Sequence, residues 1–296
     1  MTEAVQSRWS HHGVPLGFVV ESKFKEGIVA REDLKDRWAL ILGASSGFGA
    51  ATARALARAG MHIFGVHLDT RATIDRAKQV IADIEDTGRR AVFFNTNAAD
   101  ARKRARVLDK IEAVLAEEEH KSIHFVLHSL AFGTLRPFIA DDPEEATTEA
   151  QMDMTLRVMA HSLVYWVQDL VHRNLLVRGS RVYALSSEGA VRVVVPYGAV
   201  SAAKAALESH VRQLALELGP RGIAVNALRP GVTDTPALRA IPGHERWVEE
   251  ARRRNPGGRL TTPEDVATVL VALADPEVTW ISGTVIPVDG GESIVG

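Results

Sequence analysis

Cysteine is absent from this chain of 296 residues. Without a thiol the chain can form no disulfide, no thiolate metal site and no cysteine nucleophile, so these three kinds of chemistry are excluded. Tyrosine is scarce, with three residues. A catalytic phenol must therefore come from Tyr165, Tyr183 or Tyr197.

Long apolar runs and a strong net charge are missing as well. No stretch reaches the roughly 18 apolar residues of a membrane-spanning helix. The N-terminal segment MTEAVQSRWSHHG lacks the apolar core of a signal peptide. The formal net charge of -2 provides no field that would attract nucleic acid or an anionic membrane. Histidines lack the spacing of metal ligands. We therefore expect a cytoplasmic protein with no metal site that binds neither nucleic acid nor membrane.

The order of apolar and polar segments predicts the fold. Hydrophobic residues make up 46% of the chain and charged residues 24%, which is typical of a globular protein. Residues 1–36 are polar and irregular, so we expect an N-terminal extension there and one domain over 37–296. Strands that alternate with helices predict an α/β Rossmann fold with a doubly wound, seven-stranded parallel sheet. The predicted strands are 38–42, 62–68, 91–95, 123–127, 181–185, 223–228 and 285–288. The first predicted helix begins after Gly49 and ends at about residue 59. The other predicted helices cover 74–86, 104–118, 148–174 and 196–218.

Glycine gathers between the first predicted strand and its helix, in Gly43-Ala44-Ser45-Ser46-Gly47-Phe48-Gly49. Glycine lets the backbone approach a pyrophosphate there, and the helix N-terminus stabilises the negative charge. A lone glycine-rich turn also fits a tight turn or the pocket of a methyl donor. The strand–loop–helix context favours a dinucleotide. The candidate ligands in this loop are Gly43, Ser45, Ser46, Gly47, Phe48 and Gly49.

The spacing Gly-x-x-x-Gly-x-Gly resembles that of the short-chain dehydrogenase/reductase family. Three further segments carry the resemblance: Asn226 to Thr235 resembles its Asn-x-x-x-Pro-Gly segment, Val288-Asp289-Gly290-Gly291 its C-terminal signature, and Tyr197 with Lys204 its catalytic pair. The resemblance spans about residues 38–291. It implies an oxidoreductase that uses NADPH or NADH and assembles as a homotetramer or dimer.

The resemblance also implies coenzyme contacts outside the glycine loop. One segment would flank the adenine, a second would line the ribose and nicotinamide together with Lys204, and a third would hold the carboxamide and pyrophosphate. In that order the residues are Asn97 and Ala98; Ser129, Leu130 and Ala131; and Pro230, Val232, Thr233 and Thr235.

The end of the second predicted strand bears on the choice between NADH and NADPH. An acid there binds a free 2′-hydroxyl, whereas a cation binds a 2′-phosphate. His67 stands where the acid of NAD-specific members is expected. Asp69 favours NADH and Arg71 favours NADPH, so the sequence leaves both coenzymes open.

Tyr197 has Lys204 seven positions later, a spacing that neither of the other tyrosines has. Most family members space the pair by four, and a spacing of seven resembles the enoyl-acyl-carrier-protein reductase branch. Seven helical residues turn through about 700°, so both side chains share one face. Reduction of an enoyl thioester delivers hydride to the β carbon, while the enolate oxygen lies further along the substrate. Three extra residues move the phenol outward by about 5 Å.

Neighbouring segments point to the same branch, with one departure. His128-Ser129-Leu130-Ala131-Phe132-Gly133 resembles the His-Ser segment of enoyl reductases, and residues 133–137 and 185–208 resemble the Bacillus-type NADPH-dependent enzyme. The better-known bacterial members have a second tyrosine ten residues before the first, where this chain has Ser187. A serine there is also the third catalytic residue of carbonyl-reducing members.

These features lead to one expected function and two alternatives. We expect an enzyme that reduces a 2-enoyl thioester, in which Tyr197 protonates the enolate and Lys204 binds the nicotinamide ribose. An acyl carrier protein is a candidate partner at the arginine-rich residues 246–254. The first alternative is a ketone or alcohol oxidoreductase that uses Ser187, Tyr197 and Lys204. The second is a coenzyme-binding sensor without turnover.

Overall fold

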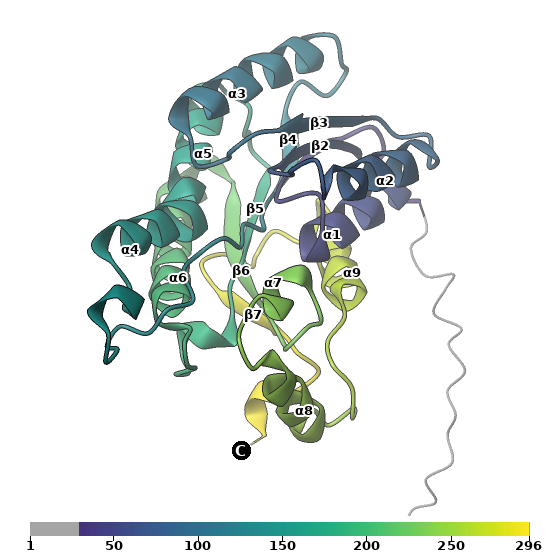
Figure 1. The fold of residues 1–296 in the computed structure, drawn as a ribbon. Helices are drawn as coiled ribbons and strands as arrows, with labels where there is room; N and C mark the ends of the chain where they lie inside the picture. The colour runs from purple at the N-terminus through teal and green to yellow at the C-terminus, as the bar shows by residue number, and fades with distance from the viewer. Residues whose placement is uncertain (1–29, 296) are drawn as a thin grey trace, which may run out of the picture.

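The computed structural model describes residues 30–295. These residues are built around a seven-stranded sheet (Figure 1). Its strand order is β3-β2-β1-β4-β5-β6-β7 and every neighbouring pair is parallel. This confirms the predicted doubly wound sheet. The strands are β1 (Trp38–Leu42), β2 (His62–His67), β3 (Ala91–Asn95), β4 (Ile123–His128), β5 (Arg181–Leu185), β6 (Ala224–Pro230) and β7 (Val285–Val288).

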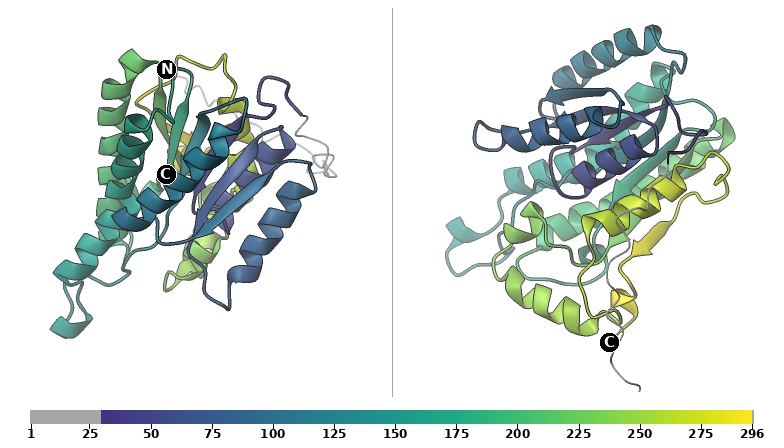
Figure 2. Two further views of the ribbon diagram at one scale, coloured as in Figure 1. Left: turned by 90° about the horizontal axis from the view of Figure 1, so that it is seen from above. Right: turned by 90° about the vertical axis from the view of Figure 1, so that its right-hand side faces the viewer.

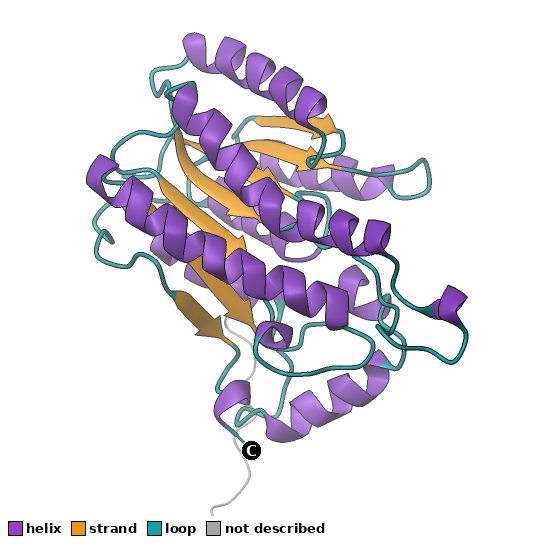
Figure 3. Ribbon diagram, turned by 90° about the vertical axis from the view of Figure 1, so that its left-hand side faces the viewer, coloured by secondary structure: helices purple, strands orange, loops and turns teal. Residues whose placement is uncertain are grey.

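Helices cover both faces of the sheet (Figures 2 and 3). They are α1 (Gly47–Arg58), α2 (Ile74–Glu85), α3 (Ala101–Ala116), α4 (Glu149–Leu156), α5 (Ser162–His172), α6 (Gly198–Leu218), α7 (Pro236–Arg239), α8 (His244–Arg254) and α9 (Pro263–Leu273). Helices α1 and α9 pack together on one face, and α3, α5 and α6 cover the other. Helix α8 lies beyond the sheet, close to the C-terminal end of the chain (Figure 1).

Each central strand contributes to two hydrophobic cores, because alternate side chains of a strand point to opposite faces. In β1, Leu40 and Leu42 enter the core beneath α3, α5 and α6, whereas Ala39 and Ile41 enter the core beneath α1 and α9. Since β1 is buried along its whole length, it reads as one continuous apolar run.

The helix predicted over 148–174 is interrupted, which corrects that prediction. It divides into α4, a π-helical turn η3 (Arg157–His161) and α5. Ser162 follows the turn, and its hydroxyl donates to the Val158 carbonyl while also contacting His128 Nε2 at 2.8 Å. A buried side-chain contact of this kind can favour a local change in helical winding. Hydrophobic periodicity carries no signal of it.

Helix α9 was not among the predicted helices, although its N-terminus has a recognisable signal. Thr262 accepts a hydrogen bond from the Asp265 N–H, and the Asp265 side chain accepts one from the Thr262 N–H. This capping box, with Pro263 at the first helical position, marks a helix start. The helix provides the crossover from β6 to β7 that a parallel sheet requires.

Part of the predicted N-terminal extension lies against the domain. Leu34 is fully buried, and the Asp36 N–H donates to the Gly60 carbonyl. Arg31 forms an ion pair with Asp275 at 2.5 Å. Residues 30–36 therefore pack on the end of the sheet opposite the site described below. Residues 1–29 of the predicted extension lie outside the described residues.

Candidate active site

The predicted site residues meet along the carboxyl edge of the central strands. The Gly43 N–H donates to the Val66 carbonyl at 2.8 Å, and the Ser129 N–H donates to the Leu42 carbonyl at 2.8 Å. After β1 the chain continues to β2, and after β4 it continues to β5, so the two connections run in opposite directions along the strand order. Such a switch point is where open α/β sheets bind their ligands.

The glycine loop is shaped by close backbone packing. Gly43 has a φ of +94°, and a Cβ on it would lie 2.4 Å from the Ser129 carbonyl oxygen. A Cβ on Gly49 would lie 2.0 Å from the Gly43 oxygen. A Cβ on Gly47 would lie 3.6 Å from the methyl group of Thr235. The loop therefore contacts both the end of β4 and the segment that follows β6.

The N-terminus of α1 fits the phosphates of a dinucleotide. Its N-cap, Ser46, makes no side-chain capping bond, and the first turn has no acidic residue. The first N–H groups of a helix need partners from outside the helix. An anion lying on this turn would satisfy them and would interact favourably with the helix dipole.

Asp69 lies beside the glycine loop. Its carboxyl group is 2.8 Å from His67 Nδ1, and its side chain is 7% exposed. Burial acts to raise the pKa of Asp69, but hydrogen bonds from Thr73, Ser45 and His67 outweigh this and keep the pKa below its ordinary value. Arg71 is exposed. The structure thus places an anion, held against the loop, at the end of β2.

The remaining predicted coenzyme ligands lie along the same edge. Asn97 Oδ1 accepts from the Ala99 N–H at 2.9 Å, and the Ala98 carbonyl accepts from Trp166 Nε1 at 2.9 Å. Leu130 is half-buried and Ala131 is exposed just after β4. Their contacts with a coenzyme stay predictions.

The last of the predicted coenzyme ligands lie at the end of β6 and in the turn that follows it. Pro230 is the last residue of β6, and Thr233 and Thr235 are buried just beyond it. Thr235 Oγ1 accepts from the Leu238 N–H at 3.2 Å and so caps α7. The Val232 N–H donates to Glu292 at 3.1 Å. The coenzyme roles of these residues also stay predictions.

The tyrosine–lysine pair lies at the start of α6. The helix begins at Gly198, two residues later than predicted, so Tyr197 is its N-cap and the extra residues of the spacing occupy the helix entry. Lys204 is buried, and its Nζ donates to the Leu185 carbonyl at 2.6 Å. Burial lowers the pKa of Lys204 to about 8, although Glu208 acts in the other direction. The remaining ammonium hydrogens are suited to ribose hydroxyls.

Tyr197 contacts both the loop after β5 and helix α8. Its hydroxyl is 3.5 Å from Ser187 Oγ, and its ring packs on Gly189, where a Cβ would lie 2.5 Å away. The ring edge meets Trp247 of α8 at a centroid distance of 6.1 Å. Burial raises the pKa of Tyr197, and the Ser187 contact only partly opposes this. The phenol is therefore neutral, with a hydrogen to donate, near pH 7.

Sequence reasoning missed the carboxylate that supports this helix. Glu208 lies one turn after Lys204 on α6 and is buried. Its Oε1 accepts from Ser186 Oγ at 2.5 Å and from Arg229 Nη2 at 2.9 Å. The pair Lys204 and Glu208, four residues apart, was a usable signal, because such residues share a helix face.

Exposed apolar side chains occur in two segments, the one after β4 and the one between β5 and α6. Their exposed fractions are 66% for Phe132, 51% for Phe138, 89% for Ile139, 63% for Val191, 97% for Val193 and 77% for Val195.

Comparison with known proteins identifies the class of protein and then the family. A dinucleotide loop, a tyrosine and a buried lysine on this sheet define a nicotinamide-dependent oxidoreductase. A family model described as "Enoyl-(Acyl carrier protein) reductase" matches residues 43–293. The chain therefore belongs to the short-chain dehydrogenase/reductase family, in the enoyl-reductase-like branch, and its coenzyme is NADH or NADPH.

Individual relatives differ in the reactions that their names state. The chain is 30% identical to cis-4-hydroxycyclohexanecarboxylate dehydrogenase of Sinomonas cyclohexanicum, over 89% of this chain and 99% of that protein. It is 28% identical to 1-cyclohexenylcarbonyl-CoA reductase of Streptomyces collinus, over 86% of each. The solved enoyl-[acyl-carrier-protein] reductase (NADH) of Aquifex aeolicus VF5 superposes with a TM-score of 0.77 at 26% identity, over 89% of this chain and 98% of that one.

No metal centre is evident in the part of the chain that the structure describes. Residues 30–295 contain no group of three or more histidine, aspartate or glutamate side chains that could hold a metal ion. Across the same residues, no helix combines the length and apolarity that crossing a bilayer requires.

Proposed function

We propose that this protein reduces the carbon–carbon double bond of a 2-enoyl thioester. The observation that carries the proposal is the position of Tyr197 at the N-cap of α6, seven residues before the buried Lys204. In this arrangement the phenol comes from the residue just before the first turn of α6, and the lysine lies further along the same helix. That offset suits an oxygen three bonds away from the carbon that receives hydride, which is two bonds further than the oxygen of a reduced ketone.

The side chains of this chain account for the proton and the developing charge. Bound NADH or NADPH supplies the hydride for the β carbon. Negative charge then develops on the thioester oxygen, where the Tyr197 hydroxyl donates a hydrogen bond and subsequently a proton, which gives the enol. The enol becomes the saturated thioester when its α carbon gains a proton and its oxygen loses one. The Lys204 ammonium binds the ribose and favours the phenolate that Tyr197 becomes.

The surroundings support an acyl substrate. The exposed apolar side chains of the segments after β4 and between β5 and α6, among them Val193 and Val195, suit a hydrocarbon body rather than a charged one. The matching family model and the Streptomyces and Aquifex relatives are named for reductions of this kind. An acyl carrier protein or a coenzyme A thioester would deliver such a substrate, and we expect a homo-oligomer.

One observation favours a second candidate function. The Tyr197 hydroxyl and Ser187 Oγ lie 3.5 Å apart, so a serine and a tyrosine could bind one carbonyl oxygen together. The Sinomonas relative is named as a dehydrogenase of a hydroxy acid. The alternative is therefore a ketone or alcohol oxidoreductase that uses Ser187, Tyr197 and Lys204.

Two thioesters separate the candidates. The purified full chain is assayed with crotonyl and acetoacetyl thioesters, each with NADH and with NADPH, and product is identified by mass. The proposal expects reduction of the crotonyl thioester. Turnover of the acetoacetyl thioester alone would replace it with the alternative, and coenzyme binding without turnover of either would favour the sensor.

A further inference from the structure

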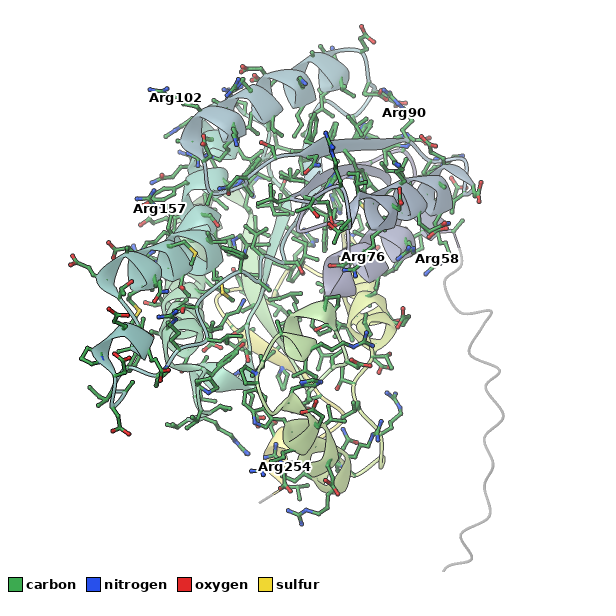
Figure 4. All side chains as sticks on the ribbon, in the orientation of Figure 1. Arg58, Arg76, Arg90, Arg102, Arg157 and Arg254 are labelled. Atoms are coloured by element: carbon green, nitrogen blue, oxygen red, sulfur yellow. The ribbon has the colours of Figure 1, made fainter. Side chains whose placement is uncertain are left out.

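An arginine at the end of α8 lies between two carboxylates from distant parts of the chain. Arg254 Nη2 is 3.2 Å from Glu292 Oε1 and 3.5 Å from Glu188 Oε2. The Arg254 side chain is 13% exposed and the Glu292 side chain 1% exposed. We refer to these three residues as the Arg254 cluster. Figure 4 shows Arg254 on α8, beside the C-terminal segment.

Each carboxylate of the Arg254 cluster belongs to a segment that forms the site. Glu188 directly follows Ser187 and begins a short helical turn, η4 (Glu188–Ala190). Glu292 begins the turn η6 (Glu292–Ile294), and its second oxygen accepts from the Val232 N–H at 3.1 Å. One guanidinium thus joins α8 to the loops that carry Ser187 and Val232.

Two further contacts join the same segments. Arg192 Nη2 donates to the Ser293 carbonyl at 3.1 Å, and Asn255 Nδ2 donates to the Asp289 carbonyl at 2.8 Å. The C-terminal turn is therefore tied to both the loop before α6 and the end of α8. Because Trp247 of α8 meets the Tyr197 ring, the position of α8 bears directly on the catalytic phenol.

We propose that Arg254 and Glu292 are positioning residues that hold α8 and the two site loops in the arrangement that binds substrate. Their contribution is geometric: one half-buried arginine, together with the Arg192 and Asn255 contacts, sets the distance between α8, η4 and η6. The inference concerns the substrate side of the site and applies to either candidate function.

Burial makes the cluster depend on all of its members. Burial raises the pKa of Glu292, while the Val232 N–H and Arg254 stabilise its charged form and Glu188 acts against it. Removing the arginine would leave Glu292 without its cation, whereas Glu188 would keep its ion pair with Arg192 at 3.1 Å. Buried ion pairs are inefficient as sources of stability, but breaking one is costly because a charge is left unpaired. A local rearrangement of the loops is the expected response.

The test uses the full chain and two kinds of variant. Arg254→Met removes the cation, and Glu292→Gln keeps an oxygen for the Val232 N–H while removing the charge. Arg259→Met is the first matched control, because Arg259 is 62% exposed and pairs with Asp265 of α9 rather than with a member of the cluster. Arg104→Met is the second, because the Arg104 side chain is 9% exposed and forms an ion pair with Asp169 at 2.6 Å, but this pair joins α3 to α5.

We expect Arg254→Met and Glu292→Gln each to raise the KM for the thioester at least about tenfold while kcat and the Kd for NADH change less than about threefold. Arg259→Met should leave all of these values unchanged. Arg104→Met should lower the Tm without changing the KM. The double variant, which combines Arg254→Met with Glu292→Gln, should have about the same KM as either single variant, because each single change already removes the same interaction.

Hydrogen exchange provides a readout that needs no turnover. In Arg254→Met, amides of α7 and α8 should exchange at least about tenfold faster than in the parent chain, while those of α3 and α5 stay unchanged. A loss of Tm like that of Arg104→Met, with an unchanged KM and unchanged exchange in α8, would show that the cluster serves stability only and would overturn the proposal. If the parent chain reduces neither thioester, the proposed function fails, and the exchange experiment still decides the role of the cluster.

Discussion

The coenzyme half and the substrate half of this site are built in different ways. The glycine-rich part of the coenzyme half is local: Gly43, Ser46 and Gly49 lie within one loop and the first turn of α1, and their shape follows from close backbone packing. The substrate half is assembled from remote segments, in which Arg254 meets Glu188 and Glu292 across 66 and 38 residues of sequence. A short motif therefore defines the first half, whereas long-range ion pairs define the second.

This difference matches what each half must do. A dinucleotide presents the same phosphates to every member of a family, so a rigid loop with open N–H groups is sufficient. Substrates vary, and loops held by side chains can change without disturbing the sheet. The two halves should therefore respond differently to mutation.

Tyr197→Phe is the most damaging change we expect, and it acts on the substrate half. The variant keeps the ring that packs on Gly189 and Trp247 but removes the proton donor, so kcat should fall about 10²- to 10⁴-fold while the Kd for NADH stays the same. Tyr165→Phe, at an exposed tyrosine of α5, is the matched control. A Tyr197→Phe enzyme with near-normal kcat would remove the tyrosine from the mechanism.

Gly43→Ala should have the next largest effect, and it acts on the coenzyme half. The new Cβ would lie 2.4 Å from the Ser129 carbonyl oxygen, so the loop must move and NADH should bind at least about tenfold more weakly. Gly179→Ala is the control, because Gly179 has a similar φ of +90° but nothing within 4 Å of a Cβ. Fluorescence titration with NADH measures the first effect, and thermal unfolding measures the strain that both variants share. Equal NADH affinity in the two variants would contradict the close-packing argument.

The same contrast explains what the sequence could predict. The strands of the sheet, the glycine loop and the Tyr197–Lys204 pair all follow from patterns within a few residues, because strand alternation and helical spacing are local properties. The π-helical turn precedes the Ser162 contact with His128, which joins α5 to β4, and the Arg254 cluster joins three segments that are distant in sequence. Neither leaves a periodic signal. Asp69 is intermediate: the sequence placed it after β2, but only the fold brings its carboxyl to Ser45.

Asp69→Ser should change coenzyme choice by a smaller amount. The Asp69 carboxyl is held beside the glycine loop by His67, so it would repel a 2′-phosphate, and we expect the parent chain to prefer NADH. Removing this charge should shift the ratio of NADPH to NADH affinity about tenfold toward NADPH, which corresponds to about 1.4 kcal/mol. Asp75→Ser is the control, because that carboxylate is exposed on α2 and pairs with Lys78. Titration of each variant with both coenzymes gives the ratio, and an unchanged ratio in Asp69→Ser would contradict the assignment.

Ser187→Ala should have the smallest effect if the substrate is an enoyl thioester. The Ser187 hydroxyl lies 3.5 Å from that of Tyr197, which is the long limit of a hydrogen bond, and the thioester oxygen already has the phenol as its donor. We therefore expect kcat for crotonyl thioester to fall less than about threefold. If a carbonyl oxygen is instead bound by both hydroxyls, the same variant should lose about a hundredfold in kcat on an acetoacetyl thioester. The size of this one change thus separates a site that reduces a double bond from one that reduces a ketone, because only the second needs the serine as a partner in charge stabilisation.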